Sequence, residues 1–416
     1  MKMIMLREQA NLAKQSTYAL MITSSALRNA ALLSMAAALE ENVELILNEN
    51  EKDLSAAAQN GRGEAMLDRL RLTKERVFDM AQGLRKVAAL PDPIGGEDFS
   101  ILRPNGIRIA RRRVPLGLIA IIYEARPNVT ADAIGLCLKS GNAVILRGGS
   151  EAIHSNVAVA DVMAQAAYES GLPEGCIQLV RDTSRETATE LMRLNSLVDV
   201  LIPRGGAELI QSVVRNATVP VIETGVGICH TYVNAAADFD MAAEIVYNAK
   251  VSRPAVCNAM ETLLIDEAIA SRCLPKIAAP LIKRGVELRG CERTRAILLE
   301  AIEATEQDWY TEYHDYILSI RVVDGLEQAI AHINKYGSHH SECIVTNDYM
   351  AAERFLNEAD AAAVYVNAST RFTDGEEFGL GAEIGISTQK LHARGPMGLN
   401  ELTSVKYIVR GDGQIR

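Results

Sequence analysis

One cysteine lies in a stretch of sequence whose composition suits a chemical role. Cys257 follows the cations Lys250 and Arg253, and Pro254 interrupts any helix there. Nearby cations lower the pKa of a thiol, and the thiolate is the form that attacks a carbonyl carbon, so Cys257 is the candidate nucleophile. The two cations could instead face substrate or solvent. A lone cysteine among Ala and Val is more commonly a small buried hydrophobe, so the assignment depends on the rest of the chain.

Two Arg-Gly-Gly triplets, each directly after a predicted strand, could hold phosphate. They are Arg147-Gly148-Gly149 and Arg204-Gly205-Gly206. Glycine permits close backbone approach, a following helix offers unbonded N–H groups to an anion, and arginine adds positive charge. The repeat favours a nucleotide site, although turn formation alone would also explain a glycine pair. The usual dinucleotide fingerprint GxGxxG is absent, so a dinucleotide would bind in a non-standard way.

Polar groups also follow two other predicted strands. Arg126 and Asn128 lie at the carboxyl end of the strand that begins at Gly117, where open α/β sheets bind ligands, and they could hold an anion or polarise a carbonyl. A salt bridge and a turn cap would be their structural roles. Glu223 and His230 could act as acid or base, although isolated acids and histidines more often make structural hydrogen bonds.

Hydroxyl, glycine and arginine residues concentrate near the end of the sequence. Ser369, Arg371, the stretch 379–388 and Arg394 could cradle a phosphate or carboxylate, or they could form only a flexible surface loop. Three adjacent arginines, 111–113, fit a solvated strand end or an intersubunit contact, with a ligand role as the alternative.

The composition describes an acidic globular protein with scattered cysteines. The 416 residues are 48% hydrophobic, enough for two or three domains, and their net charge of −10 is unsuited to nucleic acid. The seven cysteines form no CxxC pair, so we expect neither a disulfide framework nor a metal site, and a reducing cytoplasm fits best. No apolar run approaches the roughly 20 residues that span a bilayer, and segment 1–30 does not resemble a signal peptide.

Hydrophobic periodicity predicts the elements that must position these residues. Apolar residues three and four apart indicate helices over 7–60 and 73–87. Proline and glycine in 91–96 end that region, and 101–114 alternates like two strands around a turn at 104–106.

After the hairpin, strand and helix signals alternate, which predicts parallel sheets covered by helices. A second α/β half follows the first, and the two meet near 223–234. Expected strands are 117–122, 143–146, 177–180, 198–202, 219–222, 262–265, 319–323, 343–345 and 363–366. Expected helices are 130–140, 154–170, 185–194 and 208–214.

Five segments together resemble the gamma-glutamyl phosphate reductases, a branch of the aldehyde dehydrogenase superfamily. They are PLGLIAIIYEARPNV (115–129), SGNAVILRGG (140–149), IPRGG (202–206), RPAVCN (253–258) and GLGAEIGIST (379–388). The resemblance runs in one consistent order over 10–416. It implies NADPH-dependent reduction of L-glutamyl 5-phosphate to L-glutamate 5-semialdehyde and phosphate, the second step of proline synthesis from glutamate.

The resemblance also implies an aldehyde dehydrogenase-like α/β fold with two parallel-sheet domains and a small β arm. The NADP-binding domain would comprise 1–96, 115–230 and part of 376–403, and the catalytic domain 231–375. The arm would comprise 97–114 and 404–416, and its exposed strand edges would pair subunits into a homodimer or homotetramer.

Cofactor-binding positions carry over from the family residue by residue. Arg147 stands where the superfamily contacts the adenosine ribose, beside Gly148 and Gly149, and an arginine there would suit the 2′-phosphate of NADPH. Glu312 aligns with the acid that holds the nicotinamide ribose. The cofactor pyrophosphate would meet Arg204, Gly205 and Gly206.

The implied mechanism passes through a thioester. Thiolate Cys257 attacks the acyl carbon, phosphate leaves, hydride from NADPH follows, and the thiohemiacetal collapses to the aldehyde. Arg126, which replaces the superfamily's oxyanion-hole asparagine, would neutralise the phosphate, and a backbone N–H near Cys257 would stabilise the oxyanion. Glu223 matches the hydrolytic base of ordinary aldehyde dehydrogenases, but it should not activate water strongly here. Candidates for the substrate's amino and carboxylate groups are Asn128, Asn367, Ser369 and Arg371.

Three other functions compete with this one. A dehydrogenase of a free aldehyde would use the same thioester but would carry asparagine in place of Arg126. A cofactor-free scaffold would have lost the nucleophile and would not bind NADPH. An enzyme that also phosphorylates glutamate is not expected, because no kinase-sized segment precedes the reductase-like region. A separate glutamate kinase would then supply the labile substrate.

Overall fold

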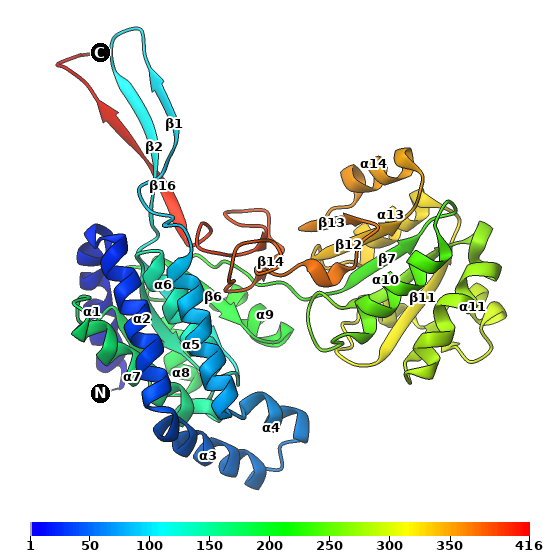
Figure 1. Ribbon diagram of the computed structural model, residues 1–416, viewed down its shortest axis with the longest axis horizontal. Coiled ribbons are helices and arrows are strands. Elements are labelled where there is room, and N and C mark those ends of the chain that lie inside the picture. The colour runs from blue at the N-terminus through cyan, green and yellow to red at the C-terminus, as the bar shows by residue number, and fades with distance from the viewer. Residues whose placement is uncertain (1) are drawn as a thin grey trace. The chain divides into compact units, whose positions relative to one another are not determined.

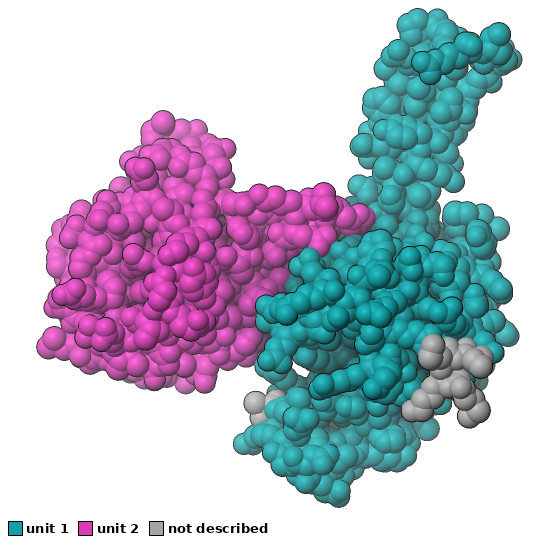
Figure 2. Space-filling model, turned by 180° about the vertical axis from the view of Figure 1, so that it is seen from behind, with its two compact units in different colours: residues 1–224, 379–385, 397–416 teal, residues 225–378, 386–396 magenta. Residues whose placement is uncertain are grey.

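A computed structural model describes residues 2–416, and the chain separates into two compact units (Figure 2). The first unit, teal in Figure 2, comprises residues up to Thr224 together with Gly379–Gly385 and Met397–Arg416. The second, in magenta, comprises Gly225–Phe378 and Ile386–Pro396. The first predicted domain began at Met1, which lies outside the described residues.

A four-stranded parallel sheet forms the centre of the first unit. The strand order is β5-β4-β3-β6, and the central strand β3 is buried at all six residues. Burial on both faces is what helix-covered parallel sheets require. The strands are β3 (Leu118–Tyr123), β4 (Ala143–Arg147), β5 (Ile177–Leu179) and β6 (Val200–Arg204).

Helices pack on this sheet and begin where the sequence supplies capping side chains. Ser24 Oγ accepts a hydrogen bond from Leu27 N at 3.2 Å, and Thr73 Oγ1 accepts one from Arg76 N at 3.2 Å. The first-unit helices are α1 (Lys2–Ile22), α2 (Ser25–Glu41), α3 (Val43–Gln59), α4 (Glu64–Leu70), α5 (Lys74–Ala89), α6 (Asn128–Lys139), α7 (Ile153–Glu169), α8 (Arg185–Leu191) and α9 (Ala207–Asn216), with a 3₁₀ turn η1 (Ser150–Ala152).

A three-stranded antiparallel sheet joins two distant parts of the chain (Figure 1). Strand β2 (Arg108–Pro115) pairs with β1 (Glu97–Leu102) on one side and with β16 (Thr403–Arg410) on the other. The C-terminal strand therefore joins the predicted hairpin, whose turn contains Gly106 at φ 87°. A role of this sheet in assembly stays a prediction.

The arginine run 111–113 is used within this sheet. Arg111 Nε donates to Asp98 Oδ1 at 2.7 Å, and Arg112 Nη2 donates to Glu97 Oε1 at 2.6 Å. Arg113 Nη1 donates to Thr403 Oγ1 at 3.0 Å. These contacts fit the interpretation of the run as part of a solvated strand.

The second unit contains a seven-stranded parallel sheet of order β10-β9-β11-β8-β7-β12-β13. Its strands are β7 (Cys229–Val233), β8 (Met260–Asp266), β9 (Glu287–Gly290), β10 (Ile302–Glu303), β11 (Ile317–Val323), β12 (Ser341–Val345) and β13 (Ala363–Val366). Its helices are α10 (Phe239–Val251), α11 (Glu267–Lys283), α12 (Glu292–Ile297), α13 (Leu326–Tyr336) and α14 (Tyr349–Glu358). Short elements are η2 (Glu306–Tyr310), η3 (Thr370–Phe372) and the antiparallel pair β14 (Ile386–Ser387) and β15 (Gly395–Pro396).

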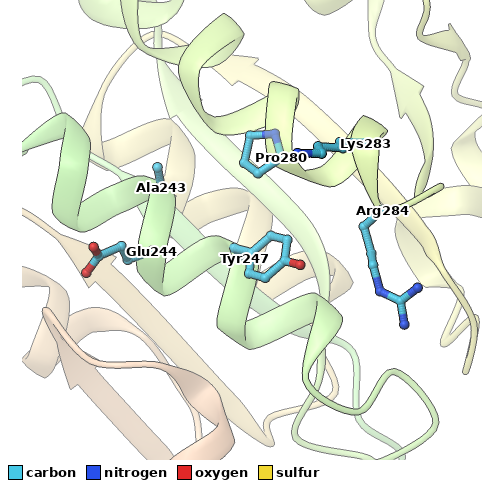
Figure 3. A pocket seen from close by; sticks show the side chains of 6 residues that line it. All are labelled: Ala243, Glu244, Tyr247, Pro280, Lys283 and Arg284. Atoms are coloured by element: carbon cyan, nitrogen blue, oxygen red, sulfur yellow. The ribbon is translucent and has the colours of Figure 1, made fainter.

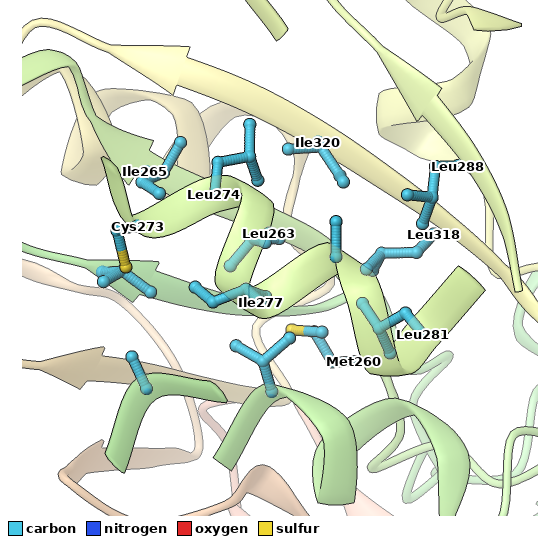
Figure 4. Close-up of a cluster of buried hydrophobic side chains, with 14 of the residues drawn as sticks. Met260, Leu263, Ile265, Cys273, Leu274, Ile277, Leu281, Leu288, Leu318 and Ile320 are labelled. Atoms are coloured by element: carbon cyan, nitrogen blue, oxygen red, sulfur yellow. The ribbon is translucent and has the colours of Figure 1, made fainter. Parts of the chain in front are cut away.

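Alternate residues of the central strand β8 build two cores on opposite faces of this sheet. Leu263 and Ile265 pack with Leu274 and Ile277 of α11 on one face (Figure 4). Leu264 points the other way and packs in a separate cluster with residues of α13 and α14. Successive side chains of a strand point to opposite faces of the sheet, so β8 contributes to both cores. Packing on both faces fixes the orientation of β8.

One predicted strand does not form. Residues 219–222 make only an isolated bridge between Val221 and Leu201. Pro220 has no N–H to donate, so the ladder cannot continue past it. Strands β7, β9 and β10 were not predicted. Over residues 2–416 no helix combines the length and apolar character that a membrane crossing needs.

Candidate active site

Cys257 lies in the loop between α10 and β8 and is partly exposed. The neighbouring Asn258 fastens this loop to the segment around η3. Asn258 Nδ2 donates to Thr373 O at 2.9 Å, and Thr370 Oγ1 donates to Asn258 O at 2.8 Å. The candidate nucleophile is therefore reachable from solvent on a loop whose backbone is held in place.

The backbone of Cys257 packs directly on Gly227. A Cβ at position 227 would lie 1.6 Å from Cys257 O and 2.4 Å from Cys257 Cα, so only glycine fits there. Gly227 N also donates to Glu312 Oε1 at 3.0 Å. The sequence indicates only a turn at 225–227, but the structure brings Cys257 and Glu312 to the same glycine.

Lys250 has a different role from the one predicted for it. It faces neither substrate nor solvent, because its side chain is fully buried and its Nζ lies 2.6 Å from Glu261 Oε2, which is also fully buried. Burial raises the pKa of Glu261 to about 7, while the Lys250 charge opposes that rise. The positive charge of Lys250 is thus engaged by Glu261. Arg253 is exposed.

Arg371 is the predicted cation that contacts the Cys257 loop within the second unit. Its Nε donates to Ser252 Oγ at 3.1 Å, and its Nη1 donates to Asn258 Oδ1. Burial and the neighbouring charge of Arg253 lower the pKa of Arg371. The charge of Arg371 thus acts near the guanidinium group of Arg253 and near the Cys257 thiol, an arrangement that suits an anionic ligand.

Two other predicted substrate contacts are engaged in local hydrogen bonds. Asn367, at φ 56°, donates through Nδ2 to Thr346 O and accepts from Thr346 N through Oδ1, both at 2.9 Å. Ser369 is buried, and its Oγ accepts from Arg371 N at 3.3 Å. Both side chains thereby shape the chain around Arg371.

In the first unit, polar groups gather at the carboxyl ends of β3 and β6. Arg126 and Asn128 are exposed there, and Asn128 Nδ2 donates to Asp132 Oδ2 at 3.3 Å. Burial raises the pKa of Asp132 to about 6, opposed by the charge of Arg204 at the end of β6. Glu223 follows the isolated bridge of Val221 to Leu201, close to the end of the same sheet.

The first Arg-Gly-Gly junction fits a polar ligand such as a nucleotide. Arg147 Nη2 donates to Thr183 O at 2.5 Å, while its buried Nε has no hydrogen-bond partner. A Cβ on Gly148 would lie 2.2 Å from Asn156 Nδ2, another buried polar atom without a partner. Unsatisfied buried donors are rare in proteins and favour a site that a ligand or water completes.

The second junction is partly filled by a side chain of the protein. Gly206 N, at the start of α9, donates to Glu124 Oε2 at 2.9 Å, and a Cβ on Gly205 would lie 2.7 Å from the same carboxylate. A cofactor pyrophosphate at this helix end would have to compete with Glu124. The sequence reasoning missed Glu124, although it stands two residues before Arg126.

A pocket of about 530 Å³ lies between α10 and α11 and contains none of the predicted site residues (Figure 3). Its lining side chains are Ala243, Glu244, Tyr247, Pro280, Lys283 and Arg284. The lining contains no cysteine and no residue predicted to bind an anion. The presence of this pocket therefore does not identify the reaction site.

Comparisons with known proteins show which family the chain resembles over most of its length. The model of the aldehyde dehydrogenase family matches residues 7–287. Gamma-glutamyl phosphate reductase of Moorella thermoacetica is 64% identical over 389 residues, covering 94% of this chain and 93% of the relative. The enzyme of the same name from Clostridium botulinum is 60% identical and covers 97% of this chain and 98% of the relative.

Solved structures support the same family. The crystal structure of gamma-glutamyl phosphate reductase from Thermotoga maritima has a TM-score of 0.97 at 47% identity and covers 99% of both chains. An acetylating aldehyde dehydrogenase from Geobacillus thermoglucosidasius, at 18% identity and a TM-score of 0.70, shares the fold. The predicted aldehyde dehydrogenase-like α/β fold is therefore confirmed, and the aldehyde dehydrogenase family implies a nicotinamide cofactor. The chain is an oxidoreductase of the aldehyde dehydrogenase family and belongs within it to the gamma-glutamyl phosphate reductases.

Proposed function

We propose that this protein reduces L-glutamyl 5-phosphate to L-glutamate 5-semialdehyde and phosphate with NADPH, as a step of proline synthesis. The observation that carries the proposal is the partly exposed Cys257 on a loop that Arg371 spans from Ser252 to Asn258. The names of relatives at 60–64% identity over nearly the whole chain support the substrate.

The acyl transfer follows from the chemistry of the thiol. The Cys257 thiolate attacks the acyl carbon, a carbon–sulfur bond forms, and the bond to the phosphate oxygen breaks. Arg371 attracts an anionic substrate to the thiol, because its positive charge acts near the Cys257 sulfur and near the charge of Arg253. After reduction, the thiohemiacetal releases the aldehyde and regenerates the thiolate.

Arg126 is proposed to bind the leaving phosphate. It is exposed at the carboxyl end of β3, the edge of a parallel sheet that binds ligands in open α/β folds. Asn128 is proposed as a second polar contact there. An arginine holds a phosphate through two parallel hydrogen bonds, which an asparagine cannot do.

The cofactor would be held by the first Arg-Gly-Gly junction and by Glu312. Arg147 supplies a fixed positive charge for a 2′-phosphate, and the unpartnered donors around Gly148 supply polar contacts. Bound NADPH supplies the hydride that takes the thioester to the aldehyde oxidation level. Arg204, rather than the Gly206 N–H that Glu124 occupies, is the proposed partner of the pyrophosphate at the second junction.

Acyl phosphates hydrolyse in water, so the substrate must come from a phosphoryl-transfer enzyme acting on glutamate. A glutamate kinase is therefore the proposed functional partner, and the protein is proposed to act in the cytoplasm as a homodimer or homotetramer. Water must also be kept from the thioester. For this reason we assign Glu223 no strong role as a water-activating base.

The test is phosphate-dependent oxidation of glutamate semialdehyde with NADP⁺, the reverse reaction. We expect wild-type protein to be active and Cys257→Ser to lose activity entirely. Cys291→Ser is the matched control, because Cys291 is also partly exposed, and it should retain activity. Full activity in Cys257→Ser would eliminate the covalent mechanism. Equal rates without phosphate would instead favour oxidation of a free aldehyde to its acid.

A further inference from the structure

A buried ion pair closes the loop that carries Cys257. Lys250 lies in the last turn of α10, before the loop, and Glu261 lies in β8, after it. Their 2.6 Å contact joins the two ends of the loop, and neither side chain is exposed. Apolar residues of similar volume commonly stabilise a core as well as a buried pair does, so the pair calls for a role other than stability.

The same pair contacts a second segment of the chain. The other oxygen of Glu261, Oε1, accepts a hydrogen bond from His314 N at 3.4 Å. Lys250 Nζ lies 5.9 Å from the centre of the Tyr313 ring. His314 has φ 57°, a left-handed conformation uncommon outside glycine, so its backbone needs surroundings that hold it.

These contacts lead back to the nucleophile through Glu312. Glu312 precedes the two contacted residues, and its Oε2 lies 3.2 Å from His314 Nε2. Its Oε1 accepts from Gly227 N at 3.0 Å, and Gly227 packs on the backbone of Cys257. The chain of contacts therefore closes on itself, from the Cys257 loop through the ion pair and Glu312 to Gly227.

We propose that Lys250 and Glu261 are positioning residues that hold the Cys257 loop and the Glu312 segment in register with each other. The inference rests on the proposed function, in which Cys257 forms the thioester and Glu312 contacts the cofactor ribose. A thiol held this way keeps one position relative to the group that holds the reductant. Small misplacements of reacting groups slow enzymes severely, so the pair governs rate without touching substrate.

The decisive variant replaces both charges with apolar groups of similar volume, Lys250→Met with Glu261→Leu. It removes the contact between the loop ends and the acceptor for His314 N, and it leaves no charge buried alone. The matched control, Arg28→Met with Asp92→Leu, removes an ion pair of the first unit whose arginine is 2% exposed. The controls for folding are the thermal midpoint and circular dichroism.

Two measurements distinguish a positioning role of the Lys250–Glu261 pair from a purely structural role. The first is the rate at which iodoacetamide alkylates Cys257, followed on the Cys257 peptide, which requires no turnover. The second is kcat and KM for glutamate semialdehyde, phosphate and NADP⁺. We expect the folded double variant to lose about 100-fold in kcat, to change its alkylation rate about tenfold, and to raise KM for NADP⁺. The control should match wild type in all three.

A folded double variant with wild-type alkylation and kcat would overturn the proposal. If the double variant does not fold, Glu261→Gln decides, because it keeps an oxygen for His314 N but loses the paired charge. It should lose at least about tenfold in kcat, and a wild-type value would equally overturn the proposal. Absence of phosphate-dependent activity in wild type would remove the proposed function alone, since alkylation rates still report on the ion pair.

Discussion

Gly227 places a strict steric limit on the site. The Cβ of an alanine there would fall 1.6 Å from Cys257 O, well inside any van der Waals contact. Only a shift of the Cys257 loop or of the 225–227 segment could relieve the clash. Such a shift would also lengthen the 3.0 Å bond from Gly227 N to Glu312.

Gly227→Ala should therefore displace both residues that contact this glycine, Cys257 and Glu312. We expect slower alkylation of Cys257, a loss of activity of about 100-fold or more, and a lower thermal midpoint. Gly96→Ala is the control, because a Cβ there meets no atom within 4 Å. Wild-type alkylation and activity in Gly227→Ala would show that the loop moves freely and that this packing is irrelevant to the thiol.

Residue types alone predicted part of this candidate site. Cys257 and Arg371 were predicted from their side-chain chemistry and from the residues next to them in the sequence. The partner of Lys250 does not, because Glu261 reaches it only when α10 and β8 lie side by side. Glu124 is likewise hidden, since its capping of Gly206 depends on the adjacency of β3 and β6.

The short helix η2 illustrates how an element can depend on one carboxylate. Asp308 Oδ2 accepts from Thr305 N at 2.6 Å, and Oδ1 accepts from Arg289 Nη1 at 2.7 Å and from Tyr313 OH at 2.8 Å. Burial opposes ionisation of Asp308, but the hydrogen bonds from Arg289 and Thr305 outweigh it and lower its pKa to about 2. The ionised carboxylate thus ties η2 to β9 and to the residues before β11.

Stability should follow the charge of this carboxylate. The pKa of Asp308 is lower in the folded state than in the unfolded state. Its stabilising contribution to the free energy of unfolding is therefore complete above the unfolded-state pKa of about 4 and is lost as the pH falls towards 2. Asp308→Asn should lower the free energy of unfolding by about 2 kcal/mol at pH 7, with a smaller difference at pH 3. Urea unfolding at both pH values measures this.

The control for that measurement is Asp161→Asn, which breaks an exposed pair with Arg181. Exposed pairs contribute little, so its effect should be within about 0.5 kcal/mol at either pH. A difference between Asp308→Asn and wild type that grows as pH falls would contradict the assignment, since the sign would be wrong for a depressed pKa.

Local sequence patterns predicted several elements. Alternation of residue types predicted the hairpin of β1 and β2, apolar runs predicted β3, β4 and β8, and the family resemblance supplied β16. Strand β7 was missed because it contains His230, whose Nδ1 lies 2.9 Å from Glu342 Oε2 of the neighbouring β12. A buried polar pair of this kind forms across strands, and neither strand alone signals it.

At the scale of the whole molecule, the three-stranded sheet exposes apolar side chains that its own unit does not cover. Val405, Tyr407 and Val409 of β16 are 40%, 64% and 59% exposed and alternate along one face. Phe99 and Ile101 of β1 are also exposed, at 45% and 37%. Outer strands with unpaired backbone groups favour association with another copy.

Charges on that face should therefore reduce the mass of the assembly. We expect Tyr407→Lys with Val409→Lys to shift the protein to a smaller species in light scattering, because lysine ammonium groups resist burial against apolar partners. Lys406→Ala, on the opposite face of β16, should leave the mass unchanged. A wild-type protein that is already monomeric would disprove subunit pairing through this sheet.

The pairing of β2 with β16 also has a consequence for synthesis of the chain. The hydrogen bond from Arg113 to Thr403 joins residues 290 positions apart, and the whole second unit lies between them in sequence. While the ribosome makes that intervening segment, the edge of β2 that pairs with β16 has no partner strand. The strands of the second unit, by contrast, lie mostly within the continuous segment Gly225–Phe378, so they can pair while that segment is being made. Among the strand edges of the first unit that become paired, this edge of β2 therefore stays unpaired longest on the nascent chain, and chaperones would be needed most there to prevent incorrect pairing.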